Sequence, residues 1–262
     1  MDVTNAISVA RVTDIGQLRV RNEDAVASEL TTGLIMVADG MGGHKGGETA
    51  SEIAVLVVAA ELAELMRKQG ALNKKSSALT VADMLDKVVS QANNAIYAAS
   101  QRNADCEGMG ATLVTGVFIN NKIVVGHIGD SRMYRLRENR LEPLTEDHSL
   151  LQEQINAGLI TKEQAKVSNN SHLITRALGT DAQVALEINE YVVKVDDIYL
   201  LCSDGLTDLV SDEEISEILV ESRGNVNVAA KNLVTLANNH GGNDNISVLT
   251  AFVKEAFSVK GS

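Results

Sequence analysis

Residues 37–48 have the sequence VADGMGGHKGGE, in which five glycines surround one aspartate, Asp39. The stretch continues the apolar run Leu34–Ala38, which is typical of a buried strand. Glycines after a strand either expose N–H groups that hold a phosphate or leave room around a metal-binding side chain. The stretch lacks GxxxxGK[ST], and its one lysine, Lys45, is misplaced for that motif. The stretch therefore does not follow the pattern of a phosphate-binding loop, and Asp39 is a candidate metal ligand.

Other strands are indicated by alternating or wholly apolar runs along the chain. They are expected at Ser8–Thr13, Ala111–Ile119, Lys122–Ile128, Met133–Arg137, Ala185–Val193, Ile198–Cys202 and Ile246–Val253. Asn120 and Asn121 suit a tight hairpin turn between two of them. Because strands follow one another without intervening helices, we expect largely antiparallel sheets.

Helices are indicated in both halves of the chain. Glu48–Lys68 is apolar nearly all round at its start, which predicts a buried helix. A second long helix is expected at Thr80–Arg102, and a last one over about residues 227–239. Shorter helices should begin at the capping boxes that Ser149, Thr161 and Ser211 open. Long helices near both ends of the chain predict sheets that are covered by helices on the outside.

The bulk composition excludes several classes of protein. The formal charge of −12 repels phosphate backbones and anionic lipids, so we expect neither nucleic-acid nor membrane binding. The longest apolar run, Ile53–Ala60, is too short to span a bilayer, and the first residues do not resemble a signal peptide. Two cysteines without metal-ligand spacing suggest a reducing compartment, so a cytoplasmic protein is expected.

Four aspartates lie where strongly apolar runs stop, namely Asp39, Asp130, Asp204 and Asp244. Each one alone is explained by turn chemistry, since aspartate followed by glycine often leaves a strand. Together they could converge at one end of a packed sheet core, where carboxylates repel one another unless cations lie between them. Oxygen ligands without nearby Cys or His pairs suit Mg²⁺ or Mn²⁺ rather than zinc.

Seven short motifs, taken in order, resemble those of the metal-dependent protein phosphatases (the PPM or PP2C family), particularly its bacterial serine/threonine phosphatase branch. They are R19-V-R-N22-E23-D24, D39-G40-M41-G42-G43, G108-M-G-A-T112, G129-D130-S131-R132, L144-T-E-D-H148, S203-D204-G205-L206-T207-D208 and G242-N-D244-N245. The resemblance extends from about residue 8 to residue 253, and we expect residues 1–262 to form a single domain. It implies an α+β fold, an α-β-β-α sandwich of two stacked, mainly antiparallel sheets flanked by pairs of helices.

The resemblance implies a pair of Mn²⁺ or Mg²⁺ ions and assigns their ligands. Asp39 would bridge the two ions, and the carbonyl of Gly40 would bind one of them. Asp204 and Asp244 would complete the shell of the other ion. In bacterial members a third, weaker ion is often seen, here near Asp130 and Asp204.

The resemblance also assigns supporting residues and a reaction. Glu23 would act on the second ion largely through water, and Asp24 and Asn245 would support the ligands. Arg19, with its fork of N–H donors, would hold the phosphate. A hydroxide that bridges the two ions would attack phosphorus in line, without a phosphoenzyme. The leaving alkoxide would take a proton from a metal-bound water or from His44, unless His44 only caps or packs the loop.

The remaining expectations concern the surroundings of the site and the biological role. Residues 149–172 correspond to the family's flap, which would be mobile and influence substrate choice, or would be a simple surface excursion. The other histidines, His127, His148, His172 and His240, are expected to be structural. The expected function is hydrolysis of phosphoserine and phosphothreonine in proteins by a monomer that reverses a bacterial serine/threonine kinase. The alternative is a catalytically inactive regulatory adaptor with the same fold.

Overall fold

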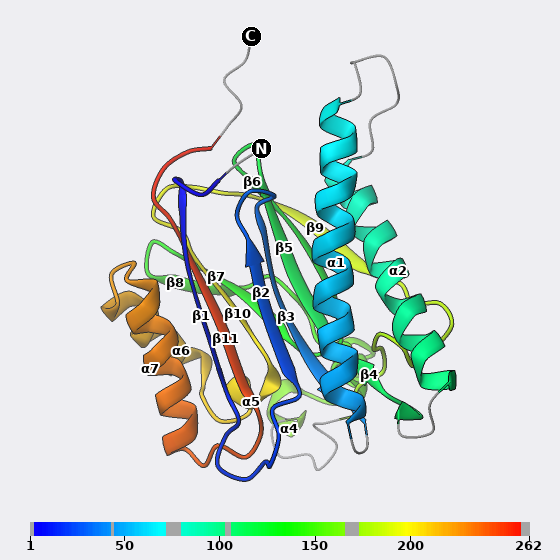
Figure 1. The fold of residues 1–262 in the computed structure, drawn as a ribbon. Helices are drawn as coiled ribbons and strands as arrows, with labels where there is room; N and C mark the ends of the chain where they lie inside the picture. The colour runs from blue at the N-terminus through cyan, green and yellow to red at the C-terminus, as the bar shows by residue number, and fades with distance from the viewer. Residues whose placement is uncertain (1–2, 43–44, 72–79, 103–105, 166–172, 258–262) are drawn as a thin grey trace.

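The computed structural model describes residues 3–42, 45–71, 80–102, 106–165 and 173–257. Two antiparallel sheets are stacked face to face (Figure 1). The first has the order β1-β11-β10-β7-β8 and comprises Ile7–Asp14, Ile246–Val253, Ile198–Cys202, Arg132–Arg137 and Arg140–Pro143. The second has the order β2-β3-β5-β6-β9 and comprises Asp24–Glu29, Leu34–Met41, Leu113–Ile119, Lys122–Ile128 and Glu187–Val192. A short strand, β4 (Gly110–Ala111), also pairs with β3.

Helices cover both outer faces of the stacked sheets, as the sequence predicts (Figure 1). The second sheet is covered by α1 (Gly46–Ala71) and α2 (Val81–Arg102), and the first sheet by α6 (Asp212–Glu221) and α7 (Val226–Asn239). Three short helices lie in the connections: α3 (Leu150–Asn156), α4 (Lys162–Ala165) and α5 (Asp204–Thr207). The α-β-β-α architecture is therefore confirmed. None of the helices in the described ranges is both long and apolar enough to cross a bilayer.

Three apolar layers hold the sandwich together. One lies between α1, α2 and the second sheet, one between the two sheets, and one between the first sheet and α6 and α7. In the middle layer, Phe118 of one sheet meets Tyr199 of the other edge to face, with ring centroids 5.3 Å apart. Fully burying a large apolar side chain of this kind stabilises a fold by about 1.5–3 kcal/mol. The middle layer therefore fixes the two sheets against each other.

Local signals for turns and caps are confirmed. Asn120 and Asn121 have φ angles of +49° and +55° and join β5 to β6, as a type I′ hairpin turn requires. The hydroxyls of Ser149, Thr161 and Ser211 each accept a hydrogen bond from a backbone N–H three residues later. These residues therefore begin helices where the sequence predicts them.

The expectation for the first long helix is wrong in one respect. Only one face of α1 is fully buried, formed by Ala50, Ala54, Val58 and Leu62 at four-residue spacing. Leu56, on another face, has 67% of its surface exposed. The apolar composition of this helix therefore does not reflect burial on all sides, because α2 and the second sheet together cover only part of its circumference.

Candidate metal centre

Strand ends bring carboxylates together at one end of the sandwich. Asp39, near the end of β3, is the register partner of Asp24 at the start of β2. Asp204 directly follows Ser203 after β10, Asp244 lies just before β11, and Asp130 follows β6 by two residues. Apart from Asp24, these aspartates line one cleft of about 1080 Å³. The structure therefore brings together the four aspartates that the sequence singles out.

The structure does not support the alternative explanation of the two Asp-Gly pairs as turns. Asp39 and Gly40 lie inside β3, which continues to Met41. Asp204 and Gly205 form the first turn of α5. Because neither pair makes a tight turn between strands, turn chemistry does not explain these aspartates.

The acids of the cluster have strongly raised pKa values. Burial raises the pKa of Asp39 and of Asp204 well above the usual range, and neighbouring carboxylates raise both further. Burial also raises the pKa of Asp24 and of Asp130 to about 6, with a further contribution from the nearby charge of Asp147 at Asp130. Carboxylates placed in this way ionise together only when positive charge lies among them.

Three oxygens of the cluster are buried without a hydrogen-bond partner among the described residues, namely Oδ1 of Asp24, Asp130 and Asp204. An unpaired buried oxygen on an acidic group is costly, so a native structure is expected to supply it with a partner. The described lining of the cleft contains no Cys or His, and a set of oxygen donors suits Mg²⁺ or Mn²⁺. The residues present therefore fit a divalent cation.

A hydrogen bond between the two sheets supports the cluster from behind. The hydroxyl of Ser203, in the first sheet's β10–α5 connection, donates to Oδ2 of Asp24 in β2 at 2.8 Å. The same hydroxyl oxygen accepts from the backbone N–H of Ser247 at 3.0 Å. The charge of Asp24 also helps to raise the pKa of the neighbouring Asp39 carboxyl. Asp24 thus lies behind Asp39, where the sequence predicts a supporting residue.

Arg19 lies at the rim of the cleft and is paired with one of the predicted metal ligands. Its Nη2 donates to Oδ2 of Asp244 at 2.6 Å, and 52% of the Arg19 side chain is exposed. Asp244 raises the pKa of Arg19 above its ordinary value through this hydrogen bond. A guanidinium carries five N–H donors, so one contact through Nη2 leaves others for an oxyanion in the cleft.

Asn245 anchors the loop that carries Arg19 and Glu23. Its Oδ1 accepts from the backbone N–H of Glu23 at 2.8 Å. Its Nδ2 donates to the carbonyls of Ile15 at 3.0 Å and Arg21 at 2.8 Å. One side chain at the start of β11 thereby fixes the β1–β2 connection at both ends. Burial raises the pKa of the Glu23 carboxyl, which also lines the cleft.

The glycines of both Asp-Gly pairs allow close contact between backbones. A Cβ at Gly40 would overlap the carbonyl oxygen of Gly47 and would lie 2.6 Å from that of Glu23. A Cβ at Gly205 would overlap the carbonyl oxygen of Asn245. Gly40 therefore packs the end of β3 against the start of α1, and its N–H donates to the Glu23 carbonyl at 3.1 Å.

Part of the predicted surroundings lies outside the described residues. This applies to His44, the candidate general acid, to His172, and to residues 166–172 of the flap. The described part of the flap is joined at its base by a bridge between Ser149 and Ile174. Leu151 and Ile155 of α3 line the cleft beside the acids. The flap therefore borders the candidate site.

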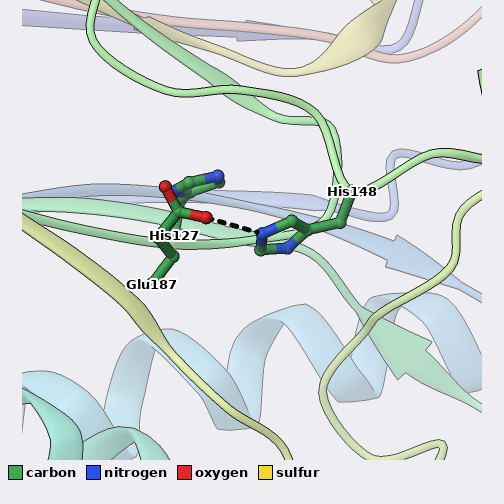
Figure 2. A group of neighbouring side chains, drawn as sticks. All are labelled: His127, His148 and Glu187. Atoms are coloured by element: carbon green, nitrogen blue, oxygen red, sulfur yellow. Dashed lines mark hydrogen bonds and ion pairs between the residues drawn. The ribbon is translucent and has the colours of Figure 1, made fainter. Parts of the chain in front are cut away.

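A second group of side chains that could bind a metal ion lies near the base of the flap (Figure 2). It consists of His127, His148 and Glu187. The two imidazole rings are stacked, with centroids 4.5 Å apart and planes inclined by only 19°. An ion would have to lie in the plane of both rings to meet their lone pairs, and these planes are nearly parallel. The observed arrangement therefore does not suit one shared ion.

Hydrogen bonds give this group a structural explanation instead. Nδ1 of His148 accepts from the backbone N–H of Gly129 at 3.2 Å, so in the neutral ring Nε2 carries the proton and faces Glu187 at 3.3 Å. Nε2 of His127 lies 2.8 Å from the carbonyl of Glu146 and therefore donates to it. Burial lowers the pKa of His148, which favours this neutral form. Both histidines thus hold the chain around residues 129 and 146–148.

Two acids near Asp130 in the cleft were not singled out from the sequence. Asp147 and Asp208 line it, and their charges help to raise the pKa of Asp130. Asp147 forms a bidentate ion pair with Arg132, at 2.8 and 2.7 Å. Each lies in a quoted motif, L144-T-E-D-H148 or S203-D-G-L-T-D208, so their place in those motifs was the available signal.

Comparison with known sequences identifies relatives along nearly the whole chain. The family model for protein phosphatase 2C matches residues 19–236. The serine/threonine phosphatase Stp of Listeria monocytogenes is 38% identical over 242 residues, which cover 90% of this chain and 92% of that protein. The protein phosphatase PhpP of Streptococcus pneumoniae is 33% identical, with 95% of this chain and 98% of that protein covered.

Solved structures show the same architecture. The serine/threonine phosphatase PstP of Mycobacterium tuberculosis superposes with a TM-score of 0.84 at 37% identity, covering 95% of this chain and all of that one. The PstP catalytic domain in complex with two manganese ions gives a TM-score of 0.81 at 38% identity, covering 95% and 99% of the two chains. This chain spans about half the length of full PstP. The chain therefore belongs to the protein phosphatase 2C family of serine/threonine protein phosphatases.

Proposed function

We propose that this protein hydrolyses phosphoserine and phosphothreonine in proteins by a metal-dependent mechanism. The observation that carries this proposal is the cluster of buried, mutually repelling aspartates with unpartnered oxygens at one end of the sheets. Such a cluster is explained by bound cations, and a related phosphatase domain is described with two manganese ions.

We assign the ligands to residues of the cleft. Asp39 would bind both ions, Asp204 and Asp244 would hold one of them, and the carbonyl of Gly40 would bind the other. Glu23 would reach the other ion through water. The raised pKa and the unpartnered Oδ1 of Asp130 support a weaker third site beside Asp204.

Paired divalent ions supply hydroxide near neutral pH and stabilise the charge that develops during in-line displacement at phosphorus. The protein's own residues would orient the substrate. The guanidinium of Arg19 would hold two phosphate oxygens with parallel N–H donors. Leu151 and Ile155 would exclude water from one side of the cleft and contact the residues that flank the phosphorylated one. The proton for the leaving hydroxyl group would come from water or from His44.

The proposal extends to the biological setting. We propose one domain over residues 1–262, with its motifs between about residues 8 and 253, that acts as a monomer on phosphoproteins and reverses the action of a serine/threonine kinase. The apolar layer shared by both sheets supports a single domain. We also propose a cytoplasmic location, which the two unpaired, buried cysteines support.

The test is hydrolysis of p-nitrophenyl phosphate by the full chain with added Mn²⁺. We expect turnover that EDTA abolishes and that Asp204→Asn lowers about 100-fold or more. An inactive regulatory adaptor would not hydrolyse the phosphate ester, whether or not Mn²⁺ is added. Absence of metal-dependent turnover in well-folded protein would therefore overturn the proposal in favour of that alternative.

A further inference from the structure

The hydrogen-bond ladder beside Asp39 is interrupted at Thr112. The register that pairs Gly40 with Ala111 places Thr112 opposite Asp39, between β4 and β5. The N–H of Thr112 donates to the Asp39 carbonyl at 2.8 Å. In a regular antiparallel pair, the N–H of Asp39 would donate back to the Thr112 carbonyl. It donates instead to the side-chain Oγ1 of Thr112 at 3.1 Å, so the hydroxyl replaces a backbone acceptor.

Thr112 also contacts the segment that carries Asp130. Its Oγ1 lies 2.6 Å from Oγ of Ser131, the residue after Asp130. Gly129, the residue before Asp130, has a φ of +98°, and a Cβ there would lie 2.7 Å from Cβ and Cγ2 of Thr112. Thr112 and Ser131 are each only 1% exposed. One buried side chain therefore contacts Asp39 and both neighbours of Asp130.

We propose that Thr112 is a positioning residue of the metal site, whose hydroxyl fixes the Asp39 segment relative to the Asp130 segment. The inference rests on the proposed function, because this positioning affects catalysis only if these aspartates bind ions. Removing a group that hydrogen-bonds to a metal ligand typically weakens metal affinity or activity about 10–100-fold. By extension, we expect a similar effect from removing the hydroxyl of Thr112, which holds the backbone N–H of Asp39. The G108-M-G-A-T112 motif thereby acquires a physical role.

Three substitutions separate positioning from ordinary packing. Thr112→Val keeps the volume and the methyl group against Gly129 but removes the acceptor for the N–H of Asp39. Thr112→Ser keeps the hydroxyl and removes the methyl group. Thr115→Val is the matched control, because Thr115 is also fully buried and its hydroxyl donates to the carbonyl of Ile35 in β3 at 3.1 Å, away from the cleft lining.

The experiment is calorimetric titration of Mn²⁺ into each metal-free full-length variant. We expect the Kd for Mn²⁺ to rise about 10-fold or more in Thr112→Val. Thr112→Ser and Thr115→Val should bind Mn²⁺ as the wild type does. The inference is overturned if Thr112→Val binds Mn²⁺ with wild-type affinity, or if Thr115→Val weakens binding as much.

Two further variants keep the outcome decisive. Asp39→Asn in the same titration tests the proposed function itself. If this variant bound Mn²⁺ with wild-type affinity, Asp39 would not be a metal ligand. Loss of binding in Asp39→Asn with normal binding in Thr112→Val would overturn only the role of Thr112. If circular dichroism shows that Thr112→Val does not fold, Ser131→Ala carries the test, because it removes only the contact toward Asp130. Unchanged Mn²⁺ affinity in Ser131→Ala would then overturn the inference.

Discussion

Asp204 combines burial, several acidic neighbours and a buried oxygen without a hydrogen-bond partner in the described part of the chain. We predict that Asp204→Asn lowers Mn²⁺-dependent turnover about 100-fold or more, because a direct ligand should matter at least as much as its supporting groups. The same change should raise the Tm of the metal-free protein by about 2–4 °C, the shift that corresponds to about 1 kcal/mol in a chain of this size. The physical reason is relief of repulsion among buried carboxylates.

The measurements are p-nitrophenyl phosphate turnover and thermal unfolding in EDTA, with wild type alongside. A lower metal-free Tm in Asp204→Asn would mean that this carboxylate stabilises the fold. The interpretation of the cluster as a cation site would then lose its main support.

Arg19 tests substrate recognition at the scale of one residue. We predict that Arg19→Ala raises the KM for p-nitrophenyl phosphate about 10-fold or more, since a hydrogen bond to a charged group contributes about 1.5–3 kcal/mol. Arg19→Lys should restore little of this loss, because an ammonium cannot make the two parallel contacts of a guanidinium. Steady-state kinetics with Arg21→Ala as the neighbouring control checks the prediction. Equal effects at both arginines would argue against a specific phosphate contact.

A residue could be predicted from the sequence where its role follows from the residues next to it in the chain. Asp39 and Asp204 could be predicted because each ends a strongly apolar run, and the family motifs then assigned them. The role of Thr112 could not be predicted, because it depends on the pairing of Thr112 with Asp39, which lies 73 residues away in the sequence. The bond from Ser203 to Asp24 joins different sheets, so no local pattern indicates it.

At the scale of elements, the long buried strands, the long helices and the helices that begin at capping boxes were predictable, whereas β2, β8 and α5 were not. β2 has the sequence DAVASE and no fully buried position, so it lacks a clear apolar face. β8 is four residues long and ends in Pro143, and α5 is a single turn. Each of these elements is determined by its pairing partner or by the residues that follow it. A local sequence pattern contains little information about either.

The contact between β3 and α1 leads to a prediction for Gly40. Gly40→Ala places a methyl group against the backbone of Gly47 and Glu23, where no flexible side chain can move aside. Overpacking of this kind costs about 1–3 kcal/mol, so we expect the Tm to fall by several degrees and Mn²⁺ binding to weaken.

The matched control is Gly126→Ala in β6, whose new methyl group would lie 3.3 Å from the flexible end of Leu186. Thermal unfolding and Mn²⁺ titration of both variants check the prediction. An equal or larger loss of Mn²⁺ affinity in Gly126→Ala would show that the effect is not specific to the corner beside Asp39.

At the scale of the whole molecule, the cluster should make stability depend on pH. The pKa of Asp24 and of Asp130 is about 6 in the folded protein, against an ordinary value of 3.8. The folded state therefore binds more protons than the unfolded state between about pH 4 and pH 6. Stability of the metal-free protein should fall as the pH rises through this window.

Mn²⁺ should act in the opposite direction, because it binds the ionised carboxylates. We predict that the rise in Tm on adding Mn²⁺ is larger at pH 7 than at pH 5. Thermal unfolding at both values, in EDTA and in Mn²⁺, measures this, and Asp130→Asn should reduce the pH dependence in EDTA. Equal Mn²⁺-induced shifts at the two pH values would contradict the account.

We propose that the aspartate cluster, rather than the stacked histidine pair, holds the catalytic ions. Anomalous diffraction from crystals grown with Mn²⁺ tests it most directly. We predict two strong peaks between the carboxylates of Asp39, Asp204 and Asp244, with Asp39 in contact with both. A dominant peak beside His127 and His148, with none between these aspartates, would contradict it.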